Sequence, residues 1–95
     1  MILIDEPRPV SFRRFKLGAH MISTYGGEMG TNELLRFGRR IGQRPSWLQK
    51  RGQPDEHFDV FDGRIEAAVQ AGAMKVTSRE LVEHIRAKRR ARAST

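Results

Sequence analysis

The sequence predicts a small α/β domain with a mixed or mostly parallel sheet of three to four short strands and about three helices. Short β-branched and apolar runs alternate along the chain with segments of helical periodicity, which is typical of this class. The length of 95 residues suits one compact core. We place the α/β domain at residues 1–86. Residues 87–95 are expected to form a basic, flexible C-terminal tail, because they lack an apolar face.

The strands are predicted from short apolar runs that end at turn-forming residues. Ile2-Leu3-Ile4 predicts a buried strand that stops at Asp5. Pro7 and Pro9 follow, and proline has no N–H to donate to a neighbouring strand, so we expect an extended loop there. Three later segments predict further strands: residues 20–24, 57–60 and 73–76.

The helices are predicted from apolar spacing and from capping residues. Thr31 is expected to cap a first helix whose apolar positions run to Ile41. Residues 63–71 predict a second helix. The third is expected after Thr77, because Glu80 three residues later completes a capping box.

The composition excludes several classes of protein. There is no cysteine, which excludes a disulfide scaffold, a zinc ribbon and a thiol nucleophile. The N-terminal apolar run breaks at Asp5 and Glu6, unlike a signal peptide. No segment approaches the about 20 apolar residues of a membrane helix. We therefore expect a cytoplasmic protein that does not associate with membranes.

The charge balance favours an anionic partner. Eighteen Lys and Arg against eleven Asp and Glu give a net charge of +7, which suits a polyanion such as nucleic acid. The alternative is that the positive charge serves solubility alone. The arginines expected to contact nucleic acid lie in the loop after Pro9, on the first helix and in the tail: Arg13, Arg14, Arg36, Arg39, Arg40, Arg89 and Arg90.

Four ionisable residues lie near the ends of predicted strands: Asp5, His20, His57 and Asp59. The chain has no Walker loop, no dinucleotide fingerprint and no nucleophile elbow, so these residues are the candidates for chemistry. Two carboxylates and two imidazoles suit a divalent metal that activates water to hydrolyse a phosphodiester. Without a metal, a His–Asp pair suits a general base and its orienting partner. The alternative is structural: Asp5 caps the following turn, His57 hydrogen-bonds a carbonyl at the sheet edge, and Asp59 pairs with an arginine.

Three segments resemble a family of small phage and bacterial proteins that is classed only as a domain of unknown function. They are ILIDEP at positions 2–7, HMIS at 20–23, and HFDV at 57–60 followed by AAVQAGAMKVTSREL at 67–81. The resemblance implies that Asp5, His20, His57 and Asp59 match the polar motifs of this family, and it implies no activity. The chain departs from the family in its more basic loop at positions 12–17 and in its basic tail.

Three functions remain open at this stage. The first is association with nucleic acid through the arginine-rich surfaces. The second is metal-dependent hydrolysis of nucleic acid or nucleotides at the His and Asp residues, with a divalent metal as cofactor. The third is a phage-type effector that binds a host protein through an exposed patch around Trp47 and Phe61. Homodimerisation through uncovered strand edges is compatible with each of them.

Overall fold

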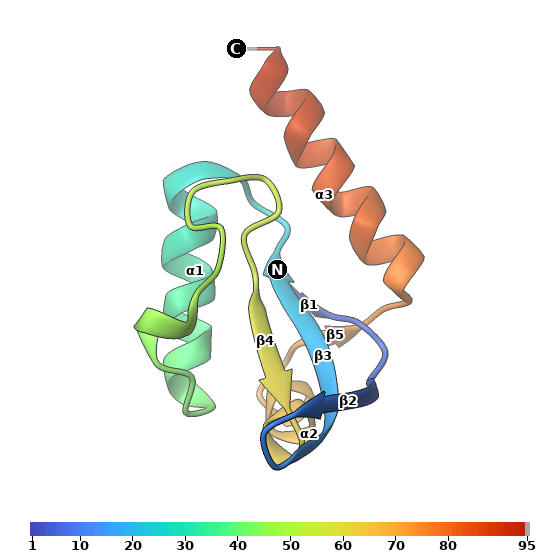
Figure 1. The fold of residues 1–95 in the computed structure, drawn as a ribbon. Coiled ribbons are helices and arrows are strands. Elements are labelled where there is room, and N and C mark those ends of the chain that lie inside the picture. Colours follow the sequence, from blue (N-terminus) through green and yellow to red (C-terminus); the bar gives the residue numbers. More distant parts are fainter. Residues whose placement is uncertain (95) are drawn as a thin grey trace.

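A computed structural model describes residues 1–94 of the chain (Figure 1). Its elements are, in order, β1 (Ile2–Ile4), β2 (Arg8–Phe12), β3 (Phe15–Ser23), α1 (Gly27–Arg40), the 3-10 turn η1 (Pro45–Trp47), β4 (Phe58–Phe61), α2 (Gly63–Gln70), β5 (Met74–Lys75) and α3 (Ser78–Ala93). The α/β class and the three predicted helices are confirmed within these residues.

The long strand β3 organises the sheet. It pairs antiparallel with β1, β2 and β4, whereas β1 also pairs parallel with β5, so the sheet is mixed. Five strands form it in the described part of the chain, which corrects the prediction of three to four.

The additional strand is β2, where the two prolines had predicted a loop. Pro9 pairs with Leu17 in a strand at the end of the sheet, and the register shifts between Pro9 and Phe12. Proline is tolerated in an edge strand because its missing N–H then costs no ladder bond. The prolines therefore place β2 at the edge of the sheet but do not prevent pairing.

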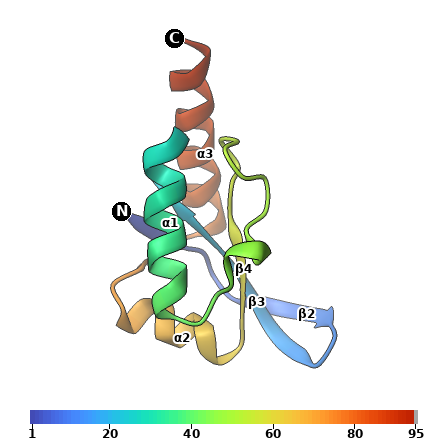
Figure 2. The same cartoon turned by 90° about the vertical axis from the view of Figure 1, so that its left-hand side faces the viewer.

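The two faces of the sheet bury different helices. Alternate strand residues, including Ile4, Met21 and Phe58, pack with α1 and α2 in the larger apolar core. Leu3 and Ile22 point to the opposite face and pack with residues of α3. Figures 1 and 2 show the resulting arrangement, with α1 and α3 on opposite sides of the strands.

Helix α1 begins five residues earlier than predicted. Gly26, not Thr31, is its N-cap residue. Gly30 explains the earlier start, because a Cβ atom there would lie 1.9 Å from the carbonyl oxygen of Tyr25. Glycine at position 30 thus allows the helix to begin close against the residues that follow β3. Thr31 lies inside the helix, where its hydroxyl donates to the buried carboxylate of Glu56 at 2.6 Å.

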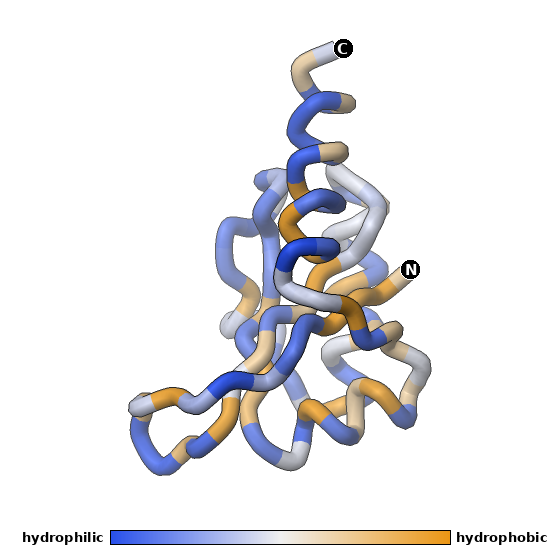
Figure 3. Tube along the Cα trace, turned by 90° about the vertical axis from the view of Figure 1, so that its right-hand side faces the viewer, coloured by the Kyte–Doolittle hydropathy of each residue, from blue (hydrophilic) through white to orange (hydrophobic). Residues whose placement is uncertain are grey.

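Helix α3 begins as the sequence predicted. Thr77 Oγ1 accepts from the N–H of Glu80, and the Glu80 carboxylate accepts from the N–H of Thr77, both at 3.1 Å. The helix continues to Ala93, so positions 87–93 are helical, and the flexibility of this segment stays a prediction. Figure 3 shows that the far end of α3 is mainly hydrophilic and extends past the rest of the protein. Within residues 1–94, no helix is long and apolar enough to cross a membrane.

Candidate functional site

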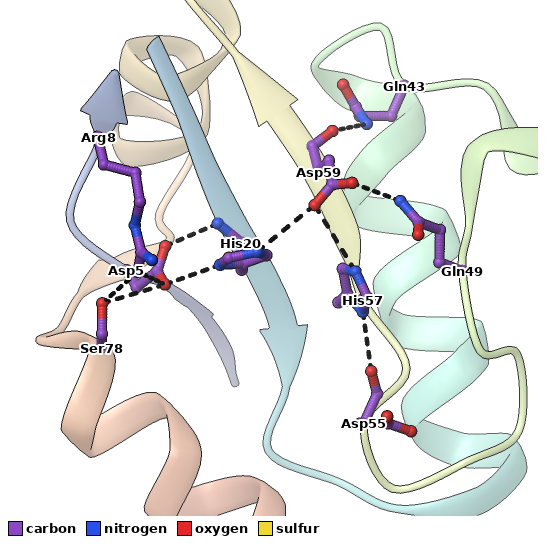
Figure 4. Close-up of polar contacts among 9 residues, drawn as sticks. All are labelled: Asp5, Arg8, His20, Gln43, Gln49, Asp55, His57, Asp59 and Ser78. Carbon is purple, nitrogen blue, oxygen red and sulfur yellow. Dashed lines mark hydrogen bonds and ion pairs between the residues drawn. The ribbon is translucent and has the colours of Figure 1, made fainter. Parts of the chain in front are cut away.

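The four residues singled out from the sequence meet on the sheet face that α3 covers in part. Asp59 of β4 is the direct cross-strand partner of His20 of β3. Asp5, just after β1, donates its backbone N–H to the His20 carbonyl on the other side of β3. His57 precedes β4. Residues from three neighbouring strands therefore form one connected row, the His–Asp chain of Asp5, His20, Asp59 and His57 (Figure 4).

Asp5 is the buried anchor of this chain, with only 2% of its surface exposed. Its Oδ1 accepts from the backbone N–H of His20 at 2.7 Å, and its Oδ2 lies 3.0 Å from His20 Nδ1. Ser78 Oγ and Arg8 Nη2 also reach Oδ2, at 3.4 and 3.5 Å. A buried carboxylate needs such partners. Here they come from β2, from β3 and from the start of α3.

Asp59 lies between the two imidazoles. Its Oδ1 is 3.7 Å from His20 Nε2 and 3.6 Å from His57 Nε2, so neither contact is a short hydrogen bond. Gln49 Nε2 donates to Asp59 Oδ2 at 2.5 Å, and Gln43 Nε2 donates to the Asp59 carbonyl at 3.2 Å. Gln49 thus holds the carboxylate and Gln43 the backbone of Asp59, while Oδ1 remains directed toward both histidines.

The hydrogen-bond partners determine which ring nitrogen of His20 and of His57 carries a proton. Asp5 and the Asp55 carbonyl can only accept, so His20 Nδ1 and His57 Nδ1 both donate, the latter at 2.9 Å. The hydrogen bond to Asp5 raises the pKa of His20, with further help from the charges of Asp5 and Asp59, although burial acts in the opposite direction. Both His20 nitrogens therefore face carboxylates, which favours the imidazolium form.

Burial acts to raise the pKa of Asp5, but the hydrogen bonds from His20 and the nearby positive charges outweigh it and the pKa is lowered. Asp5 is thus held as a carboxylate beside a cationic His20.

The four residues contact one another rather than surround one point. Within residues 1–94, no group of three or more His, Asp or Glu side chains is arranged to hold a metal ion. We therefore assign none of the four as a metal ligand, and the metal-dependent mechanism stays a hypothesis.

Next to Asp59 lies a cavity of about 320 Å³ that is rich in aromatic rings, here called the aromatic cavity. Phe15 and Phe61 stack with ring centroids 4.3 Å apart, and Phe12 stacks on both. Trp47 of η1 also lines the cavity and is 42% exposed. Aromatic faces left open to solvent in this way can accept a flat ligand.

Arginine side chains accompany these rings. The guanidinium carbons of Arg64 and Arg44 lie 5.4 and 5.8 Å from the Trp47 ring centroid, and that of Arg13 lies 5.3 Å from the Phe12 ring. These are cation–π distances. Arg13 and Arg64 line the aromatic cavity itself, so the cavity combines aromatic faces with positive charge.

A second cavity of about 340 Å³, here called the histidine cavity, adjoins the first and shares Phe12, Asp59 and Phe61 with it. It is also lined by Arg8 and by His20, whose side chain is 42% exposed. Gly18 forms part of its floor, and a Cβ atom there would lie 2.9 Å from Val10 Cγ1 and 3.3 Å from Phe61 Cε1. Glycine therefore leaves room for the Phe61 ring against the strand.

The predicted nucleic-acid arginines are spread over the molecule. Arg13 lines the aromatic cavity. Arg14 is exposed in the turn between β2 and β3. The others are exposed on the two long helices: Arg36, Arg39 and Arg40 on α1, and Arg89 and Arg90 on α3. Helix α1 packs on the sheet face opposite the His–Asp chain. One of the seven predicted arginines thus belongs to the cavity.

Several residues of the site were not predicted from the sequence: Arg8, Gln43, Arg44, Gln49, Arg64 and Ser78. Neutral polar residues in loops carry no periodic pattern, so nothing marked the two glutamines. Arg44 alone had a local signal, because it lies three residues before Trp47. Arg8 and Ser78 are 70 positions apart and meet at 2.7 Å only through the tertiary fold.

These features define a small mixed α/β domain with a row of His and Asp side chains beside an aromatic and basic cavity. The chain belongs to the family described as Protein of unknown function (DUF4031), whose model matches residues 2–88. The match covers the His–Asp chain and both cavities and ends before Arg89. No curated protein and no solved structure matches the chain.

Proposed function

We propose that the protein binds single-stranded nucleic acid, with an unpaired base in the aromatic cavity and the adjoining phosphates on arginines. One observation carries the proposal: four aromatic side chains and two arginines line the same cavity on the surface of the sheet. Aromatic faces that stack bases, next to a positively charged groove that follows the phosphates, are the common features of single-strand binding.

The exposure of the rings supports this role. Phe12 and Trp47 are 48% and 42% exposed, although burying such rings would stabilise the fold. A base that stacks on them removes this surface from water. The base must be unpaired, because in a duplex both faces of each base are already stacked.

The positive charge supplies the second part of the interaction. The net charge is +7, and Arg8, Arg13 and Arg64 line the two adjoining cavities. Cationic side chains attract phosphates regardless of sequence, and this attraction weakens as salt rises. The exposed arginines of α3 extend the positive surface beyond the cavities and are proposed to hold flanking phosphates.

Fluorescence anisotropy tests the proposal directly. Labelled single- and double-stranded DNA and RNA are titrated with protein at low and at physiological salt. The decisive variant is Trp47→Ala, and its matched control is Tyr25→Ala, which removes another half-exposed aromatic ring outside the aromatic cavity. We expect wild type to prefer single strands. Trp47→Ala should weaken binding about 10-fold or more, and Tyr25→Ala should change it little.

Two results would overturn the proposal. If no probe binds at low salt, the positive charge does not serve nucleic acid, and the surface around Trp47 and Phe61 becomes the place to seek a protein partner. If single strands bind but Trp47→Ala and Tyr25→Ala behave alike, binding does not use the aromatic cavity. Circular dichroism of each variant checks that the fold is kept.

A further inference from the structure

The wall between the two cavities carries an acid and a base that face each other across a gap. His20 Nε2 and Asp59 Oδ1 are 3.7 Å apart, and both side chains line the histidine cavity. Asp59 also lines the aromatic cavity. A nucleotide with its base in the aromatic cavity would therefore bring its sugar and phosphate to this wall.

Hydrogen bonds on the sides away from the gap hold the His20 ring and the Asp59 carboxylate in place. Asp5 occupies Nδ1 of His20, so the proton that His20 can give away is the one on Nε2. Gln49 holds Oδ2 of Asp59, so its Oδ1 is the oxygen that can take a proton. A donor and an acceptor fixed in this way are the requirement for general acid and general base catalysis.

We infer that the His–Asp chain is an acid–base catalytic site that hydrolyses a phosphodiester of single-stranded nucleic acid, with Asp59 as the base and His20 as the acid. The inference rests on the proposed binding function, which supplies the substrate. Arg8 lines the histidine cavity beside His20 and offsets the negative charge of an incoming phosphate.

The step conserves atoms and charge. Asp59 Oδ1 takes a proton from a water molecule, whose oxygen forms a new bond to phosphorus. The bond from phosphorus to the leaving oxygen breaks with its electron pair on that oxygen, and His20 Nε2 donates its proton there. One water is consumed, and the products are a phosphate monoester and an alcohol. Asp59 ends protonated and His20 ends neutral, and the proton returns to His20 across the 3.7 Å gap.

Asp5 and His57 are positioning residues in this site. Asp5 orients His20 and stabilises its cation, in the way that a buried carboxylate supports a catalytic histidine. His57 Nε2 lies 3.6 Å from the same Asp59 oxygen, while its Nδ1 is tied to the Asp55 carbonyl. It limits the movement of the carboxylate along β4.

A cleavage assay without metal tests the inference. Single-stranded RNA and DNA with a fluorophore and a quencher at opposite ends are incubated with the full chain in EDTA. The variants are His20→Asn, whose amide can still donate to Asp5, and Asp59→Asn. His84→Ala is the control, because His84 is an exposed histidine on α3 outside both cavities. Binding of each variant to an uncleaved probe is measured in parallel by anisotropy.

We expect wild type and His84→Ala to cleave in EDTA. His20→Asn and Asp59→Asn should lose about 100-fold or more in rate but bind within about 3-fold of wild type. Asp5→Asn should shift the high-pH limb of the rate profile to lower pH, because the groups around His20 (Asp5, Arg8, Asp59 and His57) then lose a negative charge. A purely structural role of Asp5 would leave that limb in place.

The opposing results are distinct. Binding without cleavage overturns the catalytic inference and leaves the binding function intact. Cleavage that needs Mg²⁺ or Mn²⁺ overturns the metal-free mechanism. Cleavage that persists in both His20→Asn and Asp59→Asn shows that another site or a contaminant is responsible. Absence of both binding and cleavage overturns the two proposals together.

Discussion

His20 and Asp59 are direct partners across β3 and β4, yet their nearest side-chain atoms, Nε2 and Oδ1, stay 3.7 Å apart. Each is held from its far side, His20 by Asp5 and Asp59 by Gln49. A gap between an acid and a carboxylate is unusual inside a hydrogen-bonded chain, because closing it would strengthen both contacts. Both atoms belong to side chains that line the histidine cavity, so a ligand in the cavity can hydrogen-bond to both.

Because Asp5 anchors the His–Asp chain, we expect its substitution to lower the stability of the fold strongly. Asp5→Asn removes the charge that faces His20 and Arg8, and its amide places hydrogens against donors. We expect unfolding in urea to show a loss of about 1.5–3 kcal/mol. Glu6→Gln is the matched control, since it removes one negative charge from the next, exposed position. Equal losses in the two variants would mean that the buried network contributes nothing specific.

The Asp5–His20 pair also predicts how stability depends on pH. The pKa of His20 is raised above its ordinary 6.5, so its stabilisation is present below that value and is lost as pH rises through the raised pKa. The pKa of Asp5 is lowered below 3.8, so its stabilisation is present above that value and is lost as pH falls through the lowered pKa.

Comparison with His20→Asn isolates this effect, because all other titrating groups are shared. The difference in unfolding free energy between wild type and His20→Asn should be larger at about pH 5.5 than at about pH 9. Chemical denaturation at the two pH values measures it. A difference that is constant, or that grows toward high pH, would show that His20 is not held as a cation in the folded protein.

Local signals in the sequence predicted the parts of the fold that depend on neighbours in the chain. The capping box of Thr77 and Glu80 formed as expected, and so did the first strand, because both follow from residues a few positions apart. The strand at Arg8–Phe12 was missed because proline weakens a strand only where its N–H would bond to a neighbouring strand. Whether a neighbouring strand lies on that side of the chain depends on the tertiary fold.

The four residues of the His–Asp chain were predictable from the sequence, but their geometry was not. Asp5, His20, His57 and Asp59 stood out as ionisable groups near strand ends. Their contact depends on register, which pairs His20 with Asp59 across two strands that are far apart in the sequence. The arginines beside Trp47 were not predictable for the same reason: Arg64 of α2 lies over the ring of Trp47 only through the tertiary fold.

Asp62 has a strained backbone conformation, and its side chain holds the β2–β3 hairpin through hydrogen bonds. Its φ is 48° and its ψ is −124°, a region suited to glycine, and its Oδ1 accepts from the N–H groups of Lys16 and Leu17 at 3.0 and 2.9 Å. We expect Asp62→Gly to lose the two hydrogen bonds but relieve the strain. Asp62→Ala should lose the bonds and keep the strain, and so be less stable than Asp62→Gly by about 1 kcal/mol.

Thermal unfolding of the two Asp62 variants measures this difference, and hydrogen exchange reports on the hairpin. In both variants the amides of Lys16 and Leu17 should exchange faster than in wild type. Equal stability of Asp62→Gly and Asp62→Ala would mean that the backbone relaxes to an unstrained conformation once the carboxylate is gone.

Gly18 connects the packing of Phe61 with the proposed binding of single strands. A Cβ atom at this position would meet Val10 and Phe61, so Gly18→Ala must push the Phe61 ring away from the strand. We expect a loss of about 1–3 kcal/mol in stability. Binding to single strands should weaken as well, because Phe61 lines both cavities. If affinity is unchanged although stability falls, Phe61 does not contact the nucleic acid.

Salt dependence separates the cavity arginines from those on α1. Arg64→Ala and Arg36→Ala each remove one positive charge, but Arg64 lines the aromatic cavity and Arg36 is exposed on the helix behind the sheet. A lost phosphate contact reduces the slope of log K against log salt concentration by about 0.7 for a single strand. We therefore expect the slope to fall in Arg64→Ala and to stay near the wild-type value in Arg36→Ala. Trp47→Ala should lower the affinity at every salt concentration with little change in slope, because stacking releases no counterions. Anisotropy titrations at four or five salt concentrations give these slopes. The reverse pattern, with the slope reduced in Arg36→Ala and unchanged in Arg64→Ala, would move the phosphate-binding surface to α1, which carries three of the seven arginines predicted from the sequence.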